Sequence, residues 1–296
     1  MADTTTGTRV TFGIKTSQGS YEDVLAVWQE ADSIPAIEHA WLWDHMLPLR
    51  EPVTAPQLEG WTLLAALAAR TSRLRLGLMV TNNLMRLPAV LAKTAATLDA
   101  ISGGRLEFGI GAGAGAEAGR REYEAYGIPL VSQAEAIHRL DEACALVRRM
   151  WIEPQVDHDG RHYRLRGAVC EPKPVQSPHP PIVIGGTGER LTLQVVARHA
   201  DTWNCPGPPW FTVEQFRHKS AVLDAHCAAV GRDPARIGRQ VYALVDSREP
   251  GAARDALQPF IAAGATQVVL GDRAPGGTVR RLVDEIVAPL AGEAAA

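Results

Sequence analysis

An acid and an imidazole stand side by side directly after a short apolar run. Asp44 and His45 follow segment 40–43, which reads Ala-Trp-Leu-Trp. A histidine can donate a proton or a hydrogen bond near neutral pH, and a neighbouring carboxylate can orient it. Burying either group without a partner costs several kcal/mol, so neither suits the interior of a strand. Spacing alone leaves a second interpretation open, in which His45 lies at the edge of the fold and is satisfied by a neighbour.

A glycine-rich segment at 185–190 has the composition of an anion-binding loop. It reads Gly-Gly-Thr-Gly-Glu-Arg, after an apolar run and before a helical pattern. Glycines let backbone N–H groups approach a phosphate, and a helix N-terminus favours negative charge. A turn that needs unusual backbone angles would explain the glycines equally well.

Three further segments carry side chains that could contact a ligand. The polar residues 81–83 could hydrogen-bond a flat heterocycle, and ordinary loop capping explains them as well. Segment 206–211 contains three prolines and Trp210, and it could roof a site or act as a rigid connector. Trp41 and Trp43 point the same way from one strand, so one could line a pocket while the other belongs to the core.

Two other patterns resemble known motifs but lack the context those motifs need. The glycines of segment 109–114 follow a strand, as in a dinucleotide-binding fingerprint, yet no strand ending in an acid follows about 20 residues later. We therefore expect a flexible loop close to a ligand, not a Rossmann fold. His158 and His162 straddle a turn without a supporting cluster of cysteines or carboxylates, so we expect solvent-exposed residues and no metal site.

The elements that must position these groups alternate along the chain between apolar runs and helical patterns. The expected strands are 10–14, 40–43, 74–80, 105–111, 181–184, 201–204, 240–245 and 266–270. The helices expected after them are 21–32, 57–70, 88–101, 133–151, 189–199, 213–230, 253–263 and 279–290. Alternation implies parallel strands covered by helices, and eight such units in 296 residues favour a closed (β/α)8 TIM barrel. Asp44 and His45 then lie on its catalytic face, at the carboxyl end of a strand.

The barrel accounts for the whole chain as one domain, 1–296, with two exceptions. Segment 154–180, between the fourth helix and the fifth strand, is expected to be an excursion over the barrel rim. Asp159 and Gly160 between extended residues predict a hairpin within it. The tail 291–296 is expected to be frayed.

Composition places the chain among ordinary soluble proteins, with 46% apolar and 21% charged residues. The net charge of −3 is spread along the chain, which gives no sign of a nucleic-acid partner. No apolar run approaches the roughly 18 residues of a membrane helix, and the N-terminus lacks the pattern of a signal peptide. The four cysteines show no close pairing, so we expect free thiols and a reducing cytoplasm.

Taken together, these segments resemble the bacterial luciferase-like family, and more narrowly its branch that depends on the deazaflavin coenzyme F420. The likeness runs from about Arg9 to Leu290. It is carried by residues 43–45, 59–68, 71–77, 88–93, 98–99, 102–105, 171–174, 180–182, 185–186 and 200–204. The resemblance implies a TIM barrel that binds a flavin-type ring at the carboxyl ends of its strands. It also implies a non-proline cis peptide near 78–80 that supports one face of the ring.

The resemblance assigns Asp44 and His45 to the ring and the substrate, with His45 as proton donor or oxyanion stabiliser. The expected cofactor contacts are Asp44, Met79, Val80, Thr81, Asn83, Gly113, Gly185, Gly186, Thr187, Gly188, Glu189, Arg190 and Trp203, with the loop 185–190 on the phosphate. The expected substrate contacts are Lys15, Trp43 and Trp210, and the position of Lys15 matches one that several deazaflavin enzymes use. The loop after 111 departs from the Gly-Ala-Gly-Trp-Asn-Glu of relatives. Ala114 cannot replace the acid of sugar-phosphate dehydrogenases, so sugar-phosphate oxidation is not expected.

The resemblance thus predicts an oxidoreductase that exchanges hydride at C5 of coenzyme F420 with a small organic substrate, while His45 handles the paired proton. Two alternatives remain open at this point: an FMN-dependent monooxygenase on the same barrel and a non-catalytic flavin-binding relative. A Rossmann enzyme using NAD is a more distant fourth. A homodimer is expected because the helices of such barrels often pair.

Overall fold

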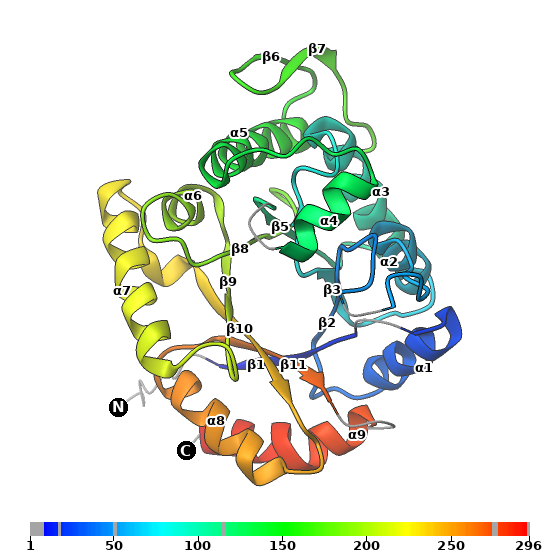
Figure 1. Cartoon of the computed structure of the whole chain (residues 1–296), viewed down its shortest axis with the longest axis vertical. Coiled ribbons are helices and arrows are strands. Elements are labelled where there is room, and N and C mark those ends of the chain that lie inside the picture. The colour runs from blue at the N-terminus through cyan, green and yellow to red at the C-terminus, as the bar shows by residue number, and fades with distance from the viewer. Residues whose placement is uncertain (1–8, 17–18, 50–51, 114–116, 274–277, 295–296) are drawn as a thin grey trace, which may run out of the picture.

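Eight parallel strand positions close into a barrel, and the helices lie outside it (Figure 1). The computed structural model describes residues 9–16, 19–49, 52–113, 117–273 and 278–294. The barrel strands are β1 (Thr11–Lys15), β2 (His39–Leu42), β3 (Arg75–Leu78) with β4 (Thr81–Asn82), β5 (Leu106–Gly111), β8 (Ile182–Gly185), β9 (Thr202–Pro206), β10 (Gly238–Val245) and β11 (Gln267–Asp272). Their order is β3-β2-β1-β11-β10-β9-β8-β5, and pairing of β3 with β5 closes the ring. The predicted (β/α)8 TIM barrel is confirmed.

The helices follow the strands as the alternation predicts. They are α1 (Tyr21–Asp32), α2 (Gly60–Ala68), α3 (Pro88–Ser102), α4 (Glu117–Ala125), α5 (Gln133–Ile152), α6 (Thr192–His199), α7 (Val213–Ala229) and α8 (Pro250–Ala262). A short 3-10 turn (Pro234–Arg236) precedes β10, and the last helix runs through α9 (Val279–Leu282), a π-helical turn (Val283–Val287) and α10 (Ala288–Ala294). The tail expected to be frayed from residue 291 is thus helical to Ala294, and 295–296 lie outside the described residues.

Local capping explains where several helices begin. Ser20 accepts a hydrogen bond from the amide of Asp23 and completes a capping box with its side chain. Glu59 accepts from the amides of Trp61 and Thr62, which fixes the start of α2. The predicted start at residue 57 was therefore too early.

The third strand is interrupted where the sequence predicts one continuous strand, 74–80. β3 ends at Leu78, a cis peptide bond joins Met79 to Val80, and β4 follows. This cis bond lies at the place that the family resemblance implied. The neighbouring glycines serve close packing, because a Cβ on Gly109 would lie only 1.9 Å from the carbonyl oxygen of Leu78. The glycine run on β5 is therefore explained by strand contacts and not by a phosphate.

A row of amide side chains crosses the barrel between three neighbouring strands. Asn204 on β9 donates from Nδ2 to Oε1 of Gln240 on β10, at 2.9 Å. Gln240 donates in turn to Oε1 of Gln267 on β11, at 2.9 Å, and is itself fully buried. The three residues are paired in register, so their side chains form one polar layer.

Segment 154–180 contains the predicted hairpin, formed by β6 (Val156–Asp159) and β7 (Arg164–Ala168). The hairpin projects beyond α5 at the outer edge of the molecule, not over the barrel rim as expected (Figure 1). Glu142 of α5 holds it by accepting from the amides of His162 and Tyr163. His158 pairs with Glu142 at 2.9 Å and His162 with Glu135 at 3.2 Å, so the expectation of solvent-exposed histidines was wrong.

Three findings concern the other sequence expectations. Among the helices of the described residues, none combines the length and the apolar character needed to cross a membrane. The same residues contain no group of three His, Cys, Asp or Glu side chains placed to hold a metal ion. All four cysteines are buried free thiols.

Candidate active site

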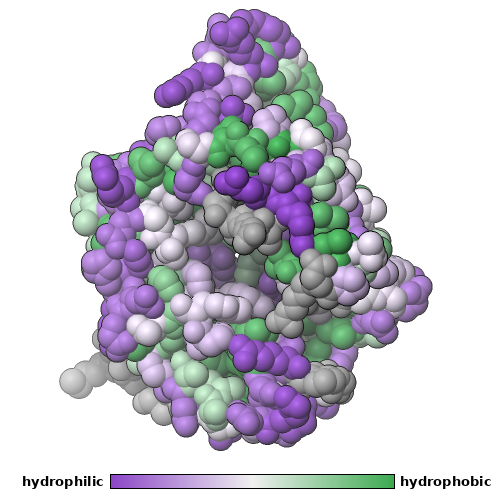
Figure 2. All heavy atoms as spheres, viewed as in Figure 1, coloured by the Kyte–Doolittle hydropathy of each residue, from purple (hydrophilic) through white to green (hydrophobic). Residues whose placement is uncertain are grey.

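Two adjoining cavities open at the carboxyl ends of the barrel strands. The first, of about 630 Å³, is lined by Lys15, Trp43, His45, Leu49, Met79, Trp210, Tyr242, Leu244, Asp272 and Arg273. The second, of about 430 Å³, is lined by Lys15, Met79, Val80, Gly185, Gly186, Thr187, Asn204, Pro206, Trp210 and Tyr242. Four residues belong to both linings, so the two cavities form one divided site. Figure 2 shows the same face of the molecule hollowed at its centre.

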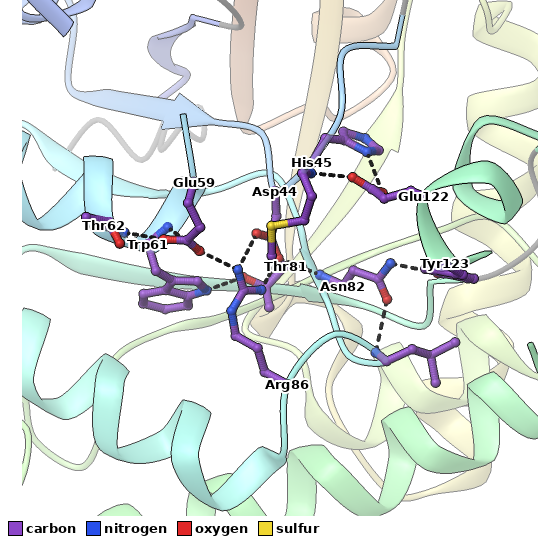
Figure 3. A network of polar contacts seen from close by, with 12 residues as sticks. Asp44, His45, Glu59, Trp61, Thr62, Thr81, Asn82, Arg86, Glu122 and Tyr123 are labelled. Atoms are coloured by element: carbon purple, nitrogen blue, oxygen red, sulfur yellow. Dashed lines mark hydrogen bonds and ion pairs between the residues drawn. The ribbon is translucent and has the colours of Figure 1, made fainter. Parts of the chain in front are cut away.

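His45 reaches the first cavity, but its partner is not Asp44. Its Nδ1 lies 3.2 Å from Oε2 of Glu122 on α4 (Figure 3). The ring of His45 packs edge-on against Trp43. The expected orientation of His45 by Asp44 is therefore corrected, because α4 supplies the carboxylate. Oε1 of Glu122 accepts from the backbone amides of Met46 and Leu47, so both carboxylate oxygens are engaged.

The electrostatics of Glu122 favour its charged form. Burial acts to raise the pKa of this carboxyl, but the hydrogen bonds from His45 and from the two backbone amides outweigh it, so the pKa lies below its ordinary value. The carboxylate beside Nδ1 holds the imidazole in one orientation and directs the other nitrogen, Nε2, away from Glu122.

Asp44 lies behind the cavity wall in a separate network. Arg86 binds it with both terminal nitrogens, at 2.6 and 2.9 Å, and also reaches Glu59 at 2.5 Å (Figure 3). The amide of Asn82 donates to the same carboxylate at 3.0 Å. Burial lowers the pKa of Arg86, yet its hydrogen bonds to the two acids outweigh this and raise that pKa, so the guanidinium stays charged. Asp44 therefore fixes the strand ends around the site, and no oxygen is left over for a ligand.

The polar residues after the third strand divide between support and cavity. Met79 lines both cavities and Val80 lines the second. Thr81 is fully buried and accepts from the indole nitrogen of Trp61 at 3.0 Å. Asn83 is also buried and donates to the hydroxyl of Tyr163 in the hairpin, at 3.1 Å. Thr81 and Asn83 were predicted as cofactor contacts, but neither residue lines the two cavities.

Gly113 packs closely against Asn82, whose side chain also contacts α4. Gly113 has a left-handed backbone, with φ of 67°, and a Cβ there would lie 2.0 Å from Oδ1 of Asn82. Nδ2 of Asn82 donates to the hydroxyl of Tyr123 on α4 at 2.6 Å. Only glycine fits this close approach. The departure from relatives at Ala114 falls on residues 114–116, which lie outside the described ranges.

The loop 185–190 is split between two environments. Gly185, Gly186 and Thr187 line the second cavity, whereas Glu189 and Arg190 line another cavity between α6 and α7. Within the described part of the chain, the backbone amides of residues 187–190 donate no hydrogen bond. These amides therefore remain available to an anion, as the first interpretation of the glycines requires.

The loop 185–190 is held in place from outside the cavity by Trp203, His218 and Lys219. Trp203 is fully buried, stacks on Phe216 and donates from its indole nitrogen to the carbonyl oxygen of Gly186 at 2.7 Å. Glu189 pairs with Lys219 at 2.5 Å and with His218 at 2.9 Å, both on α7. Trp203 and Glu189 were predicted to touch the cofactor, and in the structure their side chains are occupied by other parts of the protein.

The aromatic residues near the opening form one wall. Trp43 lines the first cavity, whereas Trp41 is buried in the barrel with Val183, which resolves the alternatives left open for this pair. Trp210 stacks on Tyr242 with ring centroids 5.4 Å apart, so the segment after β9 does border the site.

The sequence did not single out several residues of this site. Tyr242 and Leu244 lie in the second half of β10, and Asp272 and Arg273 lie at the end of β11 and directly after it. The period-two spacing of Tyr242 and Leu244 was a signal that both face the same side of the strand. Glu122 offered no comparable signal, because it is 77 residues from His45 in the sequence and belongs to a different element, α4.

Comparison with known proteins identifies the family. The luciferase-like monooxygenase family model matches residues 4–286. A phthiodiolone/phenolphthiodiolone dimycocerosates ketoreductase of Mycobacterium sp. (strain JLS) is 35% identical over 184 residues, which cover 61% of this chain and 46% of the relative. The match thus spans less than half of that relative's length.

Two solved structures share the fold. The coenzyme F420-dependent tetrahydromethanopterin reductase of Methanopyrus kandleri aligns with a TM-score of 0.79 and 17% identity, covering 95% of this chain and 99% of its own. The monooxygenase RslO1 of Streptomyces bottropensis aligns with a TM-score of 0.72 and 23% identity, covering 95% and 99%. With the family model matching nearly the whole barrel, this chain belongs to the luciferase-like monooxygenase family.

Proposed function

We propose that the protein is an oxidoreductase that transfers a hydride between coenzyme F420 and a small organic substrate. The observation that carries this proposal is the divided site itself. One half holds a histidine backed by a buried carboxylate, and the other half joins the turn at Met79 and Val80 to a loop with available amides. The first half suits proton handling and the second suits a flat ring with a phosphate.

The second cavity fits a deazaflavin by two features of its walls. Gly185 and Gly186 contribute no side chain, and a Cβ on Gly185 would lie 3.1 Å from Cγ2 of Val80 and narrow the space. The amides of residues 187–190 could receive the phosphate oxygens. When bound, the deazaflavin supplies the centre that accepts or donates the hydride.

The residues of this chain provide the rest of the chemistry. His45 holds or releases the paired proton at Nε2, which has no partner among the described residues, while Glu122 keeps the ring in one orientation. Trp43, Trp210 and Tyr242 border the opening and limit the access of water. Asp44 acts indirectly, because Arg86 occupies its carboxylate.

Cofactor titration tests the first part of the proposal. Purified protein is titrated with F420 and, in parallel, with FMN, and oxygen uptake is followed with the reduced form of each. We expect saturable F420 binding and no oxygen uptake. Tight FMN binding with oxygen consumption would identify a monooxygenase instead.

Turnover of the His45→Ala variant tests the second part. Some relatives are named ketoreductases, so a panel of small ketones and alcohols is screened with the cofactor that binds. We expect His45→Ala to retain the cofactor and to lose roughly 10²–10⁴-fold in turnover, the usual contribution of a general acid or base. Unchanged turnover would refute this role for His45. Failure of both cofactors to bind would remove the enzymatic proposal altogether.

A further inference from the structure

Lys15 occupies an unusual place at the junction of the two cavities. Its ammonium nitrogen lies 4.3 Å from the ring centroid of Trp43 and 4.3 Å from that of Tyr242, so two aromatic faces enclose it. It lines both cavities. No described carboxylate lies within ion-pair distance of it, in contrast to Lys219, which pairs with Glu189.

The charges around Lys15 leave the first cavity predominantly basic. Arg273 and His45 line the same cavity, and the carboxylate there is that of Asp272. Oδ1 of Asp272 accepts the amide of Ser247 at 3.0 Å, so part of this acid is committed elsewhere. Burial lowers the pKa of Lys15 to about 8, which still leaves the ammonium mostly charged at neutral pH.

A second hydrogen-bond donor lies close by. The indole nitrogen of Trp43 is buried and has no acceptor among the described residues, although the face of the same ring contacts Lys15. The buried indole N–H of Trp43 lacks an acceptor, and the partly buried ammonium of Lys15 lacks a carboxylate partner among the described residues. An anionic oxygen forms a stronger hydrogen bond with a charged donor than a neutral oxygen does.

We propose that Lys15 recognises a carboxylate on the substrate, so that the enzyme acts on small organic acids with an aromatic or apolar body. The carboxylate meets the ammonium between Trp43 and Tyr242, and the body of the acid packs along the wall that Trp210 and Tyr242 form. This inference rests on the proposed function, since it assigns the substrate class of the same site. It also places the acid in the cavity that contains His45.

Binding of a matched pair of probes tests the inference without requiring turnover. Benzoate and benzamide differ in charge and share one shape, and each is titrated calorimetrically into the 296-residue protein at pH 7. We expect benzoate to bind at least tenfold more tightly than benzamide. Its affinity should fall as the pH rises above about 8, because the ammonium loses its proton there while benzoate stays ionised. Equal affinities, or no benzoate binding at millimolar concentration, would overturn the inference.

Three variants assign the effect to Lys15. Lys15→Met should lose at least tenfold in benzoate affinity and keep its weak benzamide binding, which also reports an intact fold. Lys15→Arg retains a cation between the two rings and should keep most of the benzoate affinity. Lys93→Met, on the distant helix α3, is the matched control and should bind benzoate normally. Undiminished benzoate binding by Lys15→Met would refute the role of this lysine.

Titration of the same variants with F420 separates this inference from the proposed function. A wild-type protein that binds F420 and selects benzoate through Lys15 supports both. A wild-type protein that selects benzoate through Lys15 but does not bind F420 would refute the cofactor assignment and leave the carboxylate site in place. Normal F420 binding with no preference for benzoate would refute the carboxylate site and leave the cofactor assignment in place.

Discussion

Single side chains of this site depend on partners that come from distant parts of the chain. Glu122 joins His45 to the backbone of residues 46 and 47, so one carboxylate both orients the imidazole and anchors the loop that carries it. Arg86 plays the corresponding part for Asp44 and Glu59. In both cases a single charged group satisfies several polar partners that are partly or fully buried, and its removal leaves them without that hydrogen bond.

Replacing Glu122 by glutamine should impair the chemistry more than the fold. Glutamine can still accept the two backbone amides through its oxygen, but its amide nitrogen cannot accept a hydrogen bond from Nδ1 of His45. We expect turnover to fall by about tenfold or more with F420 binding unchanged, since proton transfer by a positioned side chain contributes roughly 10²–10⁴-fold. Glu124→Gln, an exposed residue of the same helix, is the control. Equal turnover in both variants would show that His45 does not need this carboxylate.

Replacing Arg86 by methionine should destabilise the protein strongly. The change leaves Asp44 buried without its counter-charge, and breaking a buried ion pair by removing one partner costs about 3–5 kcal/mol. Urea unfolding followed by circular dichroism measures this loss. Arg248→Met removes a pair with Asp246 on the surface and should have little effect. Similar midpoints for the two variants would contradict the structural role of Arg86.

At the level of elements, strands β3 and β5 approach each other closely because glycines lie where the two strands meet. A Cβ on Gly77 would lie 2.4 Å from the carbonyl oxygen of Glu107, and one on Gly111 would lie 2.8 Å from Cγ2 of Val80. The turn that borders both cavities thus rests directly on the backbone of β5. Helix α4 contacts the same part of the barrel through Glu122, which pairs with His45, and Tyr123, which accepts from Asn82.

Gly109→Ala should therefore separate the two strands. The added methyl would meet the backbone carbonyl of Leu78, so one of the two strands would have to shift, and overpacking of this kind costs about 1–3 kcal/mol or more. Thermal unfolding reports the loss. Gly251→Ala, in helix α8 with open space around the position, should be neutral or slightly stabilising. A Gly109→Ala variant as stable as wild type would show that the strands can part without penalty.

The alternation of apolar runs with helical patterns predicted every barrel strand, because parallel strands buried on both faces leave a continuous apolar signal. The ends of elements depend on caps and on contacts from elsewhere, which is why Glu59 shortened α2 and Trp203 turned out to support the loop at Gly186. Proximity in sequence suggested that Asp44 would serve His45. In the structure Glu122 contacts His45 instead, because α4 lies against the loop that follows β2, and no local pattern contains that information.

At the scale of the whole molecule, one flank of the barrel exposes apolar side chains. Leu87, Val90 and Ile101 on and beside α3 are 67%, 58% and 51% exposed. A cavity of about 540 Å³ lies on the same flank, and Val90 and Ile101 line it together with Val169 of the segment after β7. Apolar side chains gathered in this way are typical of contact surfaces between proteins.

The expected homodimer should form through this flank. Sedimentation velocity should give a dimer for the wild-type protein and a monomer for the double variant Val90→Asp/Ile101→Asp, because charges placed on both sides of a two-fold contact repel. Val230→Asp, at the end of α7 on the far side of the barrel, is the control (Figure 1). A wild-type monomer at micromolar concentration would exclude this assembly.

The amide layer of Asn204, Gln240 and Gln267 has a consequence for what the second cavity can recognise. Each donor in the row points from β9 toward β11, so the orientation of every amide is set by the next one. Nδ2 of Asn204 is committed to Gln240, and its oxygen lies toward Gly185, 3.4 Å from where a Cβ would stand. The wall at this point is therefore polarised: it presents an acceptor, and a ligand atom that meets this oxygen has to carry a hydrogen.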